Sequence, residues 1–121
     1  MKQILIIDED TFSKICAAIL ELEGYKAEIV KDLNSLKLNT DNFALVIMSY
    51  PFGYFLFEDI RKINLPTIVL TDHINKDVVN LLEDLDKSYC MVKPLDYQKF
   101  RYLVNQILKG NISDTKEINI L

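Results

Sequence analysis

Residues Ile4–Asp10 read Ile-Leu-Ile-Ile-Asp-Glu-Asp, four apolar residues followed directly by three acids. A short apolar run rich in β-branched residues is typical of a strand buried on both faces, as in a parallel sheet. The acids follow at the carboxyl end of the strand, where open parallel sheets place their ligand sites. The stretch therefore predicts a central strand and one side of a polar site.

Further strands and helices alternate along the rest of the chain. The other strand-like segments are Ala27–Val30, Leu45–Met48, Thr67–Leu70 and Tyr89–Val92. Amphipathic helices are expected from a cap at Asp10-Thr11 to Gly24 and over Tyr54–Ile63, Lys76–Leu85 and Tyr97–Lys109, with a turn or two of helix within Leu33–Asn42. Such alternation implies right-handed crossovers. The predicted fold class is α/β, a doubly wound five-stranded parallel sheet with helices on both faces.

Length and composition indicate one cytoplasmic domain. The 121 residues fit a single core, which we expect over residues 1–109, with 110–121 as a polar tail or the start of a linker. A net charge of −4 gives no basic field for direct nucleic-acid binding. No apolar run is long enough to cross a membrane. Cys16 and Cys90 are far apart and outside any metal or redox motif, which predicts reduced, buried thiols.

Polar residues follow each of the central strands. They are Asp8-Glu9-Asp10, Ser49, Thr71-Asp72 and Lys93-Pro94. The carboxyl ends of parallel strands meet at one edge of a sheet, so acids, hydroxyls and a lysine are expected to line one cleft.

These features resemble the receiver domain of two-component response regulators, across roughly Lys2 to Lys109. The resemblance is carried by Ile4–Asp10, by Leu20–Tyr25 (Leu-Glu-Leu-Glu-Gly-Tyr), by Pro66–Thr71 (Pro-Thr-Ile-Val-Leu-Thr), by Val92–Leu95 (Val-Lys-Pro-Leu) and by the spacing from Thr71 to Lys93. It implies the flavodoxin-like receiver fold, with strand order 2-1-3-4-5.

The resemblance also implies roles for individual residues. Asp8 and Glu9 take the positions of the acids that help to hold a magnesium ion. Thr71 takes the position of the hydroxyl that binds the phosphoryl group, and Lys93 that of the lysine that pairs with it. The peptide between Lys93 and Pro94 is expected to be cis.

The chain departs from the family at the residue that accepts the phosphoryl group. Ser49 stands where the family carries an aspartate. A neutral hydroxyl is a weaker magnesium ligand and needs a nearby base to become a nucleophile, and His73, the single histidine, is not placed to serve. Conventional phosphorylation is therefore expected to fail. No cofactor is required, and any magnesium site is weakened.

Neighbouring positions differ as well. The path from Ser49 to Gly53 is shorter than usual in the family, and Tyr50–Phe55 fills it with aromatic residues that we expect to pack in the core rather than form an exposed contact. Cys90 takes the position of the aromatic switch residue, although Tyr89 is adjacent. Asp72 is expected to be a solvated loop acid rather than a group that crowds the pocket.

The sequence favours a signalling module that is not an enzyme. It would bind a protein partner or dimerise through the face of Lys76–Leu85 and Tyr97–Lys109, with Tyr97, Arg101 and Tyr102 as contact residues, and an output domain could follow it. One alternative is a haloacid-dehalogenase-like phosphohydrolase, with Asp8 as nucleophile and Asp10 as general acid/base. Another is a receiver that is phosphorylated on Ser49 by a different kinase or on a neighbouring acid.

Overall fold

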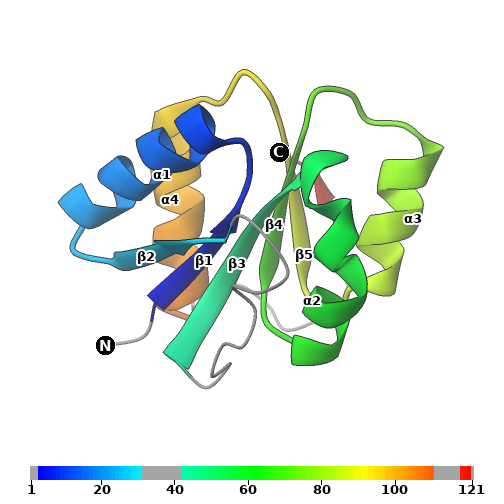
Figure 1. Cartoon of the computed structure of the whole chain (residues 1–121), viewed down its shortest axis with the longest axis horizontal. Helices are drawn as coiled ribbons and strands as arrows, with labels where there is room; N and C mark the ends of the chain where they lie inside the picture. The colour runs from blue at the N-terminus through cyan, green and yellow to red at the C-terminus, as the bar shows by residue number, and fades with distance from the viewer. Residues whose placement is uncertain (1–2, 31–41, 111–117, 121) are drawn as a thin grey trace.

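A parallel sheet organises the computed structural model, which describes residues 3–30, 42–110 and 118–120 (Figure 1). In this part of the chain the strands are β1 (Gln3–Ile7), β2 (Lys26–Ile29), β3 (Phe43–Tyr50), β4 (Thr67–Thr71), β5 (Ser88–Val92) and β6 (Ile118–Ile120), in the order β2-β1-β3-β4-β5-β6. The helices are α1 (Asp10–Leu22), the 3-10 helix η3 (Phe52–Leu56), α2 (Phe57–Ile63), α3 (Lys76–Asp84) and α4 (Tyr97–Leu108). The predicted doubly wound sheet and the order 2-1-3-4-5 are confirmed.

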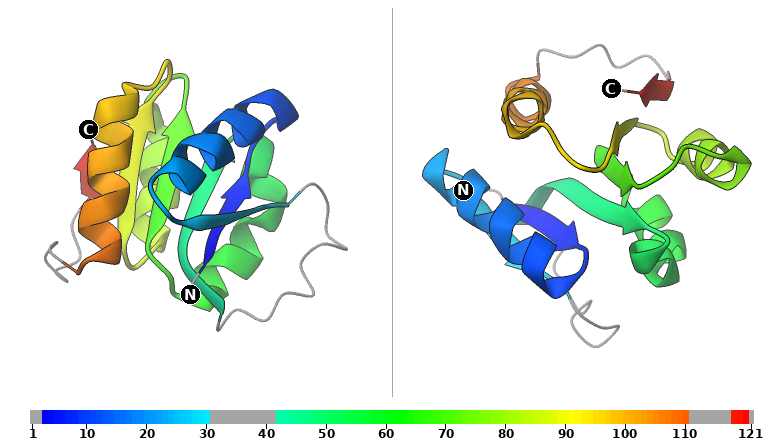
Figure 2. Two further views of the ribbon diagram at one scale, coloured as in Figure 1. Left: turned by 90° about the vertical axis from the view of Figure 1, so that its left-hand side faces the viewer. Right: turned by 90° about the horizontal axis from the view of Figure 1, so that it is seen from above.

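Two apolar cores lie on opposite faces of the sheet, because successive residues of a strand point to opposite faces. Helices α1 and α4 cover one face, where Ile6 packs with Leu20 and Phe100. Helices α2 and α3 cover the other, where Leu5 packs with Ile60. The views from the side and from above show both layers (Figure 2). This sandwich leaves the carboxyl ends of the strands free to form a site.

Several boundaries differ from the predicted ones. Helix α1 begins at Asp10 after Glu9, without the side-chain cap expected at Asp10-Thr11. The segment predicted as one helix from Tyr54 is split, because η3 forms the first turn and α2 begins only at Phe57. The short helix expected within Leu33–Asn42 falls almost wholly on residues 31–41, which lie outside the described residues.

Strand β6 was not among the predicted strands. Residues Ile118–Ile120 pair in parallel with Ser88–Cys90 of β5, so the expected polar tail contains a strand at its end. A three-residue segment carries too little periodicity to be recognised as a strand. The domain boundary at residue 109 stays a prediction.

Candidate functional site

The cleft at the carboxyl edge of the sheet is set by the register of its strands. Ile7 pairs with Met48, and Tyr50 pairs with Thr71. Ser49 and Thr71 lie within β3 and β4 rather than after them, since both strands continue pairing beyond their predicted ends. Asp8, Ser49 and Thr71 are each only 3% exposed. These three polar residues are therefore brought to one edge of the sheet but are buried there.

The strongest interaction in the cleft joins Asp8 to Lys93. The lysine Nζ lies 3.2 Å from Oδ1 and 3.1 Å from Oδ2 of the Asp8 carboxylate, and the aspartate side chain is fully buried. The backbone N–H of Glu9 also donates to Oδ1, at 2.7 Å. Lys93 Nζ lies 4.2 Å from the centre of the Phe12 ring, a cation–π contact. Asp8 and Lys93 thus neutralise each other inside the cleft.

The two hydroxyls of the cleft are not joined to this ion pair. Ser49 Oγ is buried without a hydrogen-bond partner among the described residues. The Thr71 hydroxyl donates to the backbone carbonyl of His73 at 2.8 Å. An unpaired buried hydroxyl is costly, which is characteristic of a position shaped for a different group. Ser49 Oγ thus lies in the cleft with no hydrogen-bonded base among the described residues.

Asp8 and Glu9 are the two carboxylates of the cleft that could contribute to a magnesium site. Magnesium prefers octahedral oxygen ligands and usually takes one or two carboxylates from the protein. Across the described ranges, no group of three or more His, Cys, Asp or Glu residues could hold a metal ion. The buried Asp8 is already paired with a cation, and Glu9 is exposed. Weak binding through Asp8 and Glu9 stays a prediction.

Asp8 and Asp10 do not form the catalytic pair of the phosphohydrolase alternative. The Asp10 side chain is 53% exposed at the start of α1 and pairs with Lys14 at 2.9 Å. The Asp8 side chain is buried against Lys93. A nucleophile and its general acid must face the same substrate atoms, so this arrangement gives that alternative no support.

The prediction that the aromatic loop packs in the core is wrong for most of its members. Phe52, Tyr54 and Phe55 are 42%, 54% and 45% exposed. Gly53 is the residue of this loop that packs inward. It lies so close to β1 that a Cβ at this position would lie 3.1 Å from Cγ2 of Ile7. The aromatic side chains on the rest of the turn consequently face solvent.

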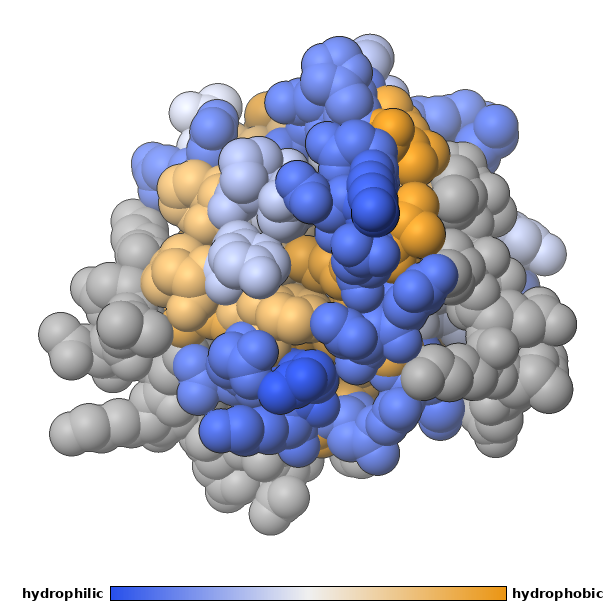
Figure 3. All heavy atoms as spheres, turned by 90° about the vertical axis from the view of Figure 1, so that its right-hand side faces the viewer, coloured by the Kyte–Doolittle hydropathy of each residue, from blue (hydrophilic) through white to orange (hydrophobic). Residues whose placement is uncertain are grey.

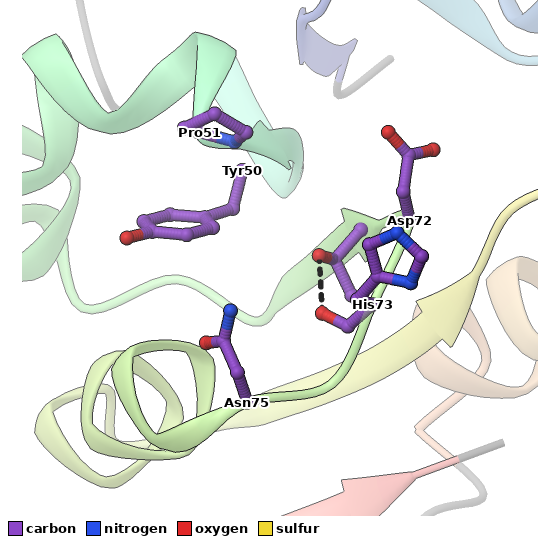
Figure 4. Close-up of a pocket in the computed structure, with 6 residues that line it drawn as sticks. Tyr50, Pro51, Asp72, His73 and Asn75 are labelled. Atoms are coloured by element: carbon purple, nitrogen blue, oxygen red, sulfur yellow. Dashed lines mark hydrogen bonds between the residues drawn. The ribbon is translucent and has the colours of Figure 1, made fainter.

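A shallow hollow of about 270 Å³ lies beside the cleft, between this loop and the loop after β4. Its lining residues are Tyr50, Pro51, Thr71, Asp72, His73 and Asn75 (Figure 4). Asp72 is exposed, as predicted. The Lys93–Pro94 peptide is cis, as predicted, and the Tyr50–Pro51 peptide is also cis, which was not predicted. No sequence pattern predicts the hollow itself.

Cys90, at the predicted switch position, is a buried thiol. Cys90 packs in the core under α2 and α3, whereas Tyr89 packs in the core under α1 and α4. Neighbouring residues of a strand face opposite ways, so Tyr89 cannot replace the missing aromatic side chain at position 90. Both cysteines are free and buried, as predicted.

The burial of Cys16 is expected to make the stability of the domain fall at high pH. Desolvation, with a smaller contribution from Asp8, raises the pKa of its thiol from 9.0 to about 12, although Lys93 opposes the rise. Between these values the unfolded thiol is ionised while the folded one keeps its proton, so stability falls as pH rises above 9. Urea unfolding on either side of pH 9 should show a smaller loss for Cys16→Ala than for the wild type. An equal loss in both would contradict this origin.

Known proteins agree with this architecture. No protein-family model matches the chain. It is 25% identical over 127 residues to the transcriptional regulatory protein CpxR homolog of Haemophilus influenzae, covering 98% of this chain and 56% of that protein. The chain thus spans about half the length of this curated relative.

Solved structures decide the fold. A two-component response regulator from Clostridium difficile superimposes with a TM-score of 0.76 at 21% identity, covering 93% of this chain and all of that one. The chain has the receiver fold. A response regulator receiver domain from Clostridium thermocellum gives a TM-score of 0.72 at 22% identity, covering 92% and 97% of the two chains. Sequence and structural likeness together support a response-regulator receiver domain.

Within this receiver fold, the described helices include none that is both long and apolar enough to span a bilayer. The predicted partner face consists of α3 and α4, with β6 paired to the β5 edge beside them. Tyr102 and Tyr97 of α4 are 67% and 39% exposed. Arg101, the third predicted contact residue, forms an ion pair within the chain: its guanidinium lies 3.6 Å from the carboxylate of Glu23 at the end of α1.

Proposed function

We propose that this receiver domain belongs to a response regulator in two-component signalling and acts through protein contacts without aspartyl phosphorylation. The observation that carries the proposal is the ion pair of Lys93 with the buried Asp8, formed while Ser49 holds the acceptor position. The lysine that would pair with a phosphoryl group is already neutralised. The domain is therefore a binding module rather than an enzyme.

The chemistry at position 49 argues against a substitute form of phosphorylation. A serine hydroxyl needs a base to become a nucleophile, and none of the described residues makes a hydrogen bond to Ser49 Oγ. The residue is only 3% exposed, which keeps it away from a protein kinase. A phosphoserine ester would also be stable, unlike the labile acyl phosphate that lets such switches reset. Phosphorylation of Ser49 is thus disfavoured because its hydroxyl has no base to activate it and because the residue is buried away from a kinase.

The contacts we propose are with a protein partner or a second copy. The CpxR homolog is a transcriptional regulatory protein longer than this chain, so an output domain that follows residue 121 is part of the proposal. The NtrC4 receiver domain, whose fold is similar, is a dimer in its beryllofluoride-activated form. The side of α2 and α3 shows hydrophobic surface broken by hydrophilic residues (Figure 3). Exposed Tyr102 and the aromatic residues of η3 offer apolar contact area. A cytoplasmic location stays a prediction.

Incubation with acetyl phosphate and magnesium, followed by intact-mass measurement, tests the proposal. We expect the wild-type mass to stay unchanged, since position 49 lacks a carboxylate and Lys93 is engaged. Gain of one phosphoryl mass would contradict the proposal and revive phosphorylation at another residue. Steady release of inorganic phosphate would instead indicate an enzyme.

A further inference from the structure

The hollow between the loop after β3 and the loop after β4 has two chemically different walls. The half-buried Tyr50 ring and Pro51 lie on one side, and Asp72, His73 and Asn75 lie on the other (Figure 4). Its volume of about 270 Å³ is just below the roughly 300–1,000 Å³ of pockets that enclose a whole small ligand. The hollow therefore has room for one long side chain of a partner.

The aromatic wall is anchored in the core through a series of rings. The buried Phe57 ring stacks on the Tyr54 ring, with 5.6 Å between their centres. Tyr54 in turn meets Tyr50 edge to face, with 5.7 Å between the centres. The Tyr50 ring is thus held in place before any partner arrives, which lowers the entropic cost of binding.

The opposite wall is fixed by hydrogen bonds within its own loop. The Thr71 hydroxyl donates to the backbone carbonyl of His73 at 2.8 Å. The Asn75 side chain accepts from the backbone N–H of Val78 at 3.0 Å, which ties the end of the loop to the start of α3. Both walls of the hollow are therefore preformed.

The charge of the hollow suits a cation. Asp72 is exposed and makes no ion pair or hydrogen bond with any of the described residues, and the described lining residues include no Lys or Arg. The positive end of the α3 dipole is capped by Asn75 and opposed by Asp77 in the first turn. Lys76, in the same turn, does not line the hollow. An aromatic ring such as Tyr50 adds to the attraction of a cation.

We propose that the hollow binds an arginine side chain of a protein partner. A planar guanidinium matches both walls, because it stacks on an aromatic ring and forms paired hydrogen bonds with a carboxylate. Phe52 and Ile74, each 42% exposed, are the chain neighbours of the lining residues Pro51 and His73. Apolar surface therefore flanks the hollow, and the partner segment carries apolar residues next to its arginine. The inference rests on the proposed function only in taking the partner to be a protein.

Titration of the ¹⁵N-labelled domain with short peptides tests the site. Acetyl-Leu-Arg-Leu-amide should shift the amide resonances of Asp72, His73 and Asn75 saturably. The same peptide with citrulline, the neutral isostere of arginine, should bind several-fold more weakly, and the lysine peptide should fall between the two. Equal binding of the arginine and citrulline peptides, or no shifts with either, would overturn the site. Equal binding of methylguanidinium and the arginine peptide would overturn the flanking contacts and with them the protein partner.

Substitutions in the two walls locate the binding. Tyr50→Leu and Asp72→Asn should each weaken binding of the arginine peptide by roughly two- to five-fold. Tyr50→Phe, which keeps the ring, and Asp86→Asn, an exposed acid before β5, are the matched controls and should bind like the wild type. Unchanged binding in both wall variants would overturn the proposal. Asp72→Asn changes only an exposed side chain, so the test holds even if circular dichroism shows that Tyr50→Leu does not fold.

The titration and the acetyl phosphate experiment fail independently. The peptides report on the hollow and acetyl phosphate reports on the buried residues of the cleft. Absence of peptide binding would leave the account of phosphorylation standing, and a phosphorylated wild type would leave the peptide result unchanged.

Discussion

Replacing Ser49 with aspartate is expected to make the stability of the domain depend on magnesium, which the wild type should not show. The substitution places a second carboxylate beside the buried Asp8, at a position that is 3% exposed. Without metal, the added buried charge should cost about 3 kcal/mol of unfolding free energy. With two acids and one lysine, the cleft would regain a net negative charge that suits a divalent cation.

Thermal unfolding with and without magnesium measures this effect. A ligand present at a hundredfold excess over its Kd stabilises the folded state by about 2.7 kcal/mol, so saturating magnesium should recover most of the loss in Ser49→Asp. Ser49→Asn is the matched control, with the same shape and no charge, and should not respond. If magnesium stabilises the wild type as much as Ser49→Asp, the cleft is not self-neutralised.

Replacing Lys93 with methionine is expected to lower the unfolding free energy by about 3 kcal/mol, because it leaves the Asp8 carboxylate buried without its cation. The Asp8 side chain is 0% exposed and the lysine side chain 20% exposed, so water cannot replace the lost partner on the aspartate side. Urea denaturation gives the number directly.

Three further variants separate the effect of the lost ion pair from the effect of losing a lysine. Lys99→Met removes an exposed lysine on α4 and should change stability by less than about 0.5 kcal/mol. Asp8→Asn should cost less than Lys93→Met, because the partly exposed ammonium can still reach water. The double variant Asp8→Asn with Lys93→Met should be more stable than Lys93→Met alone. A double variant that is less stable would show that the buried charge is not the cause.

The sequence predicted those parts of the fold that are encoded by long or strongly apolar segments. The run at Ile4–Ile7 and the periodicity of the last helix each mark an element with little ambiguity, because burial on both faces or on one stripe restricts composition. Strand β6 was not predicted, because three residues are too few to show a strand periodicity. The inward turn of Gly53, which exposes the aromatic residues around it, depends on the close approach of Ile7.

The sequence predicted which residues form the candidate site but not which side chains contact one another. Asp8, Thr71 and Lys93 reach the expected edge because the order of the strands fixes their positions. The sequence could not show that Lys93 would pair with Asp8, since that contact joins residues 85 positions apart and arises where no acid is present at position 49. Nor could the sequence show that the Thr71 hydroxyl would donate a hydrogen bond to the backbone carbonyl of His73.

The most direct test of a self-neutralised cleft is an NMR titration of the ¹⁵N-labelled wild-type chain with magnesium and beryllofluoride, a mimic of the phosphoryl group. We expect the amide resonances of Asp8, Ser49, Thr71 and Lys93 to stay in place, whereas those of Ser49→Asp should shift. Saturable shifts of the wild-type Ser49 and Lys93 resonances would show that the cleft still binds metal and phosphoryl mimic, and would contradict the account.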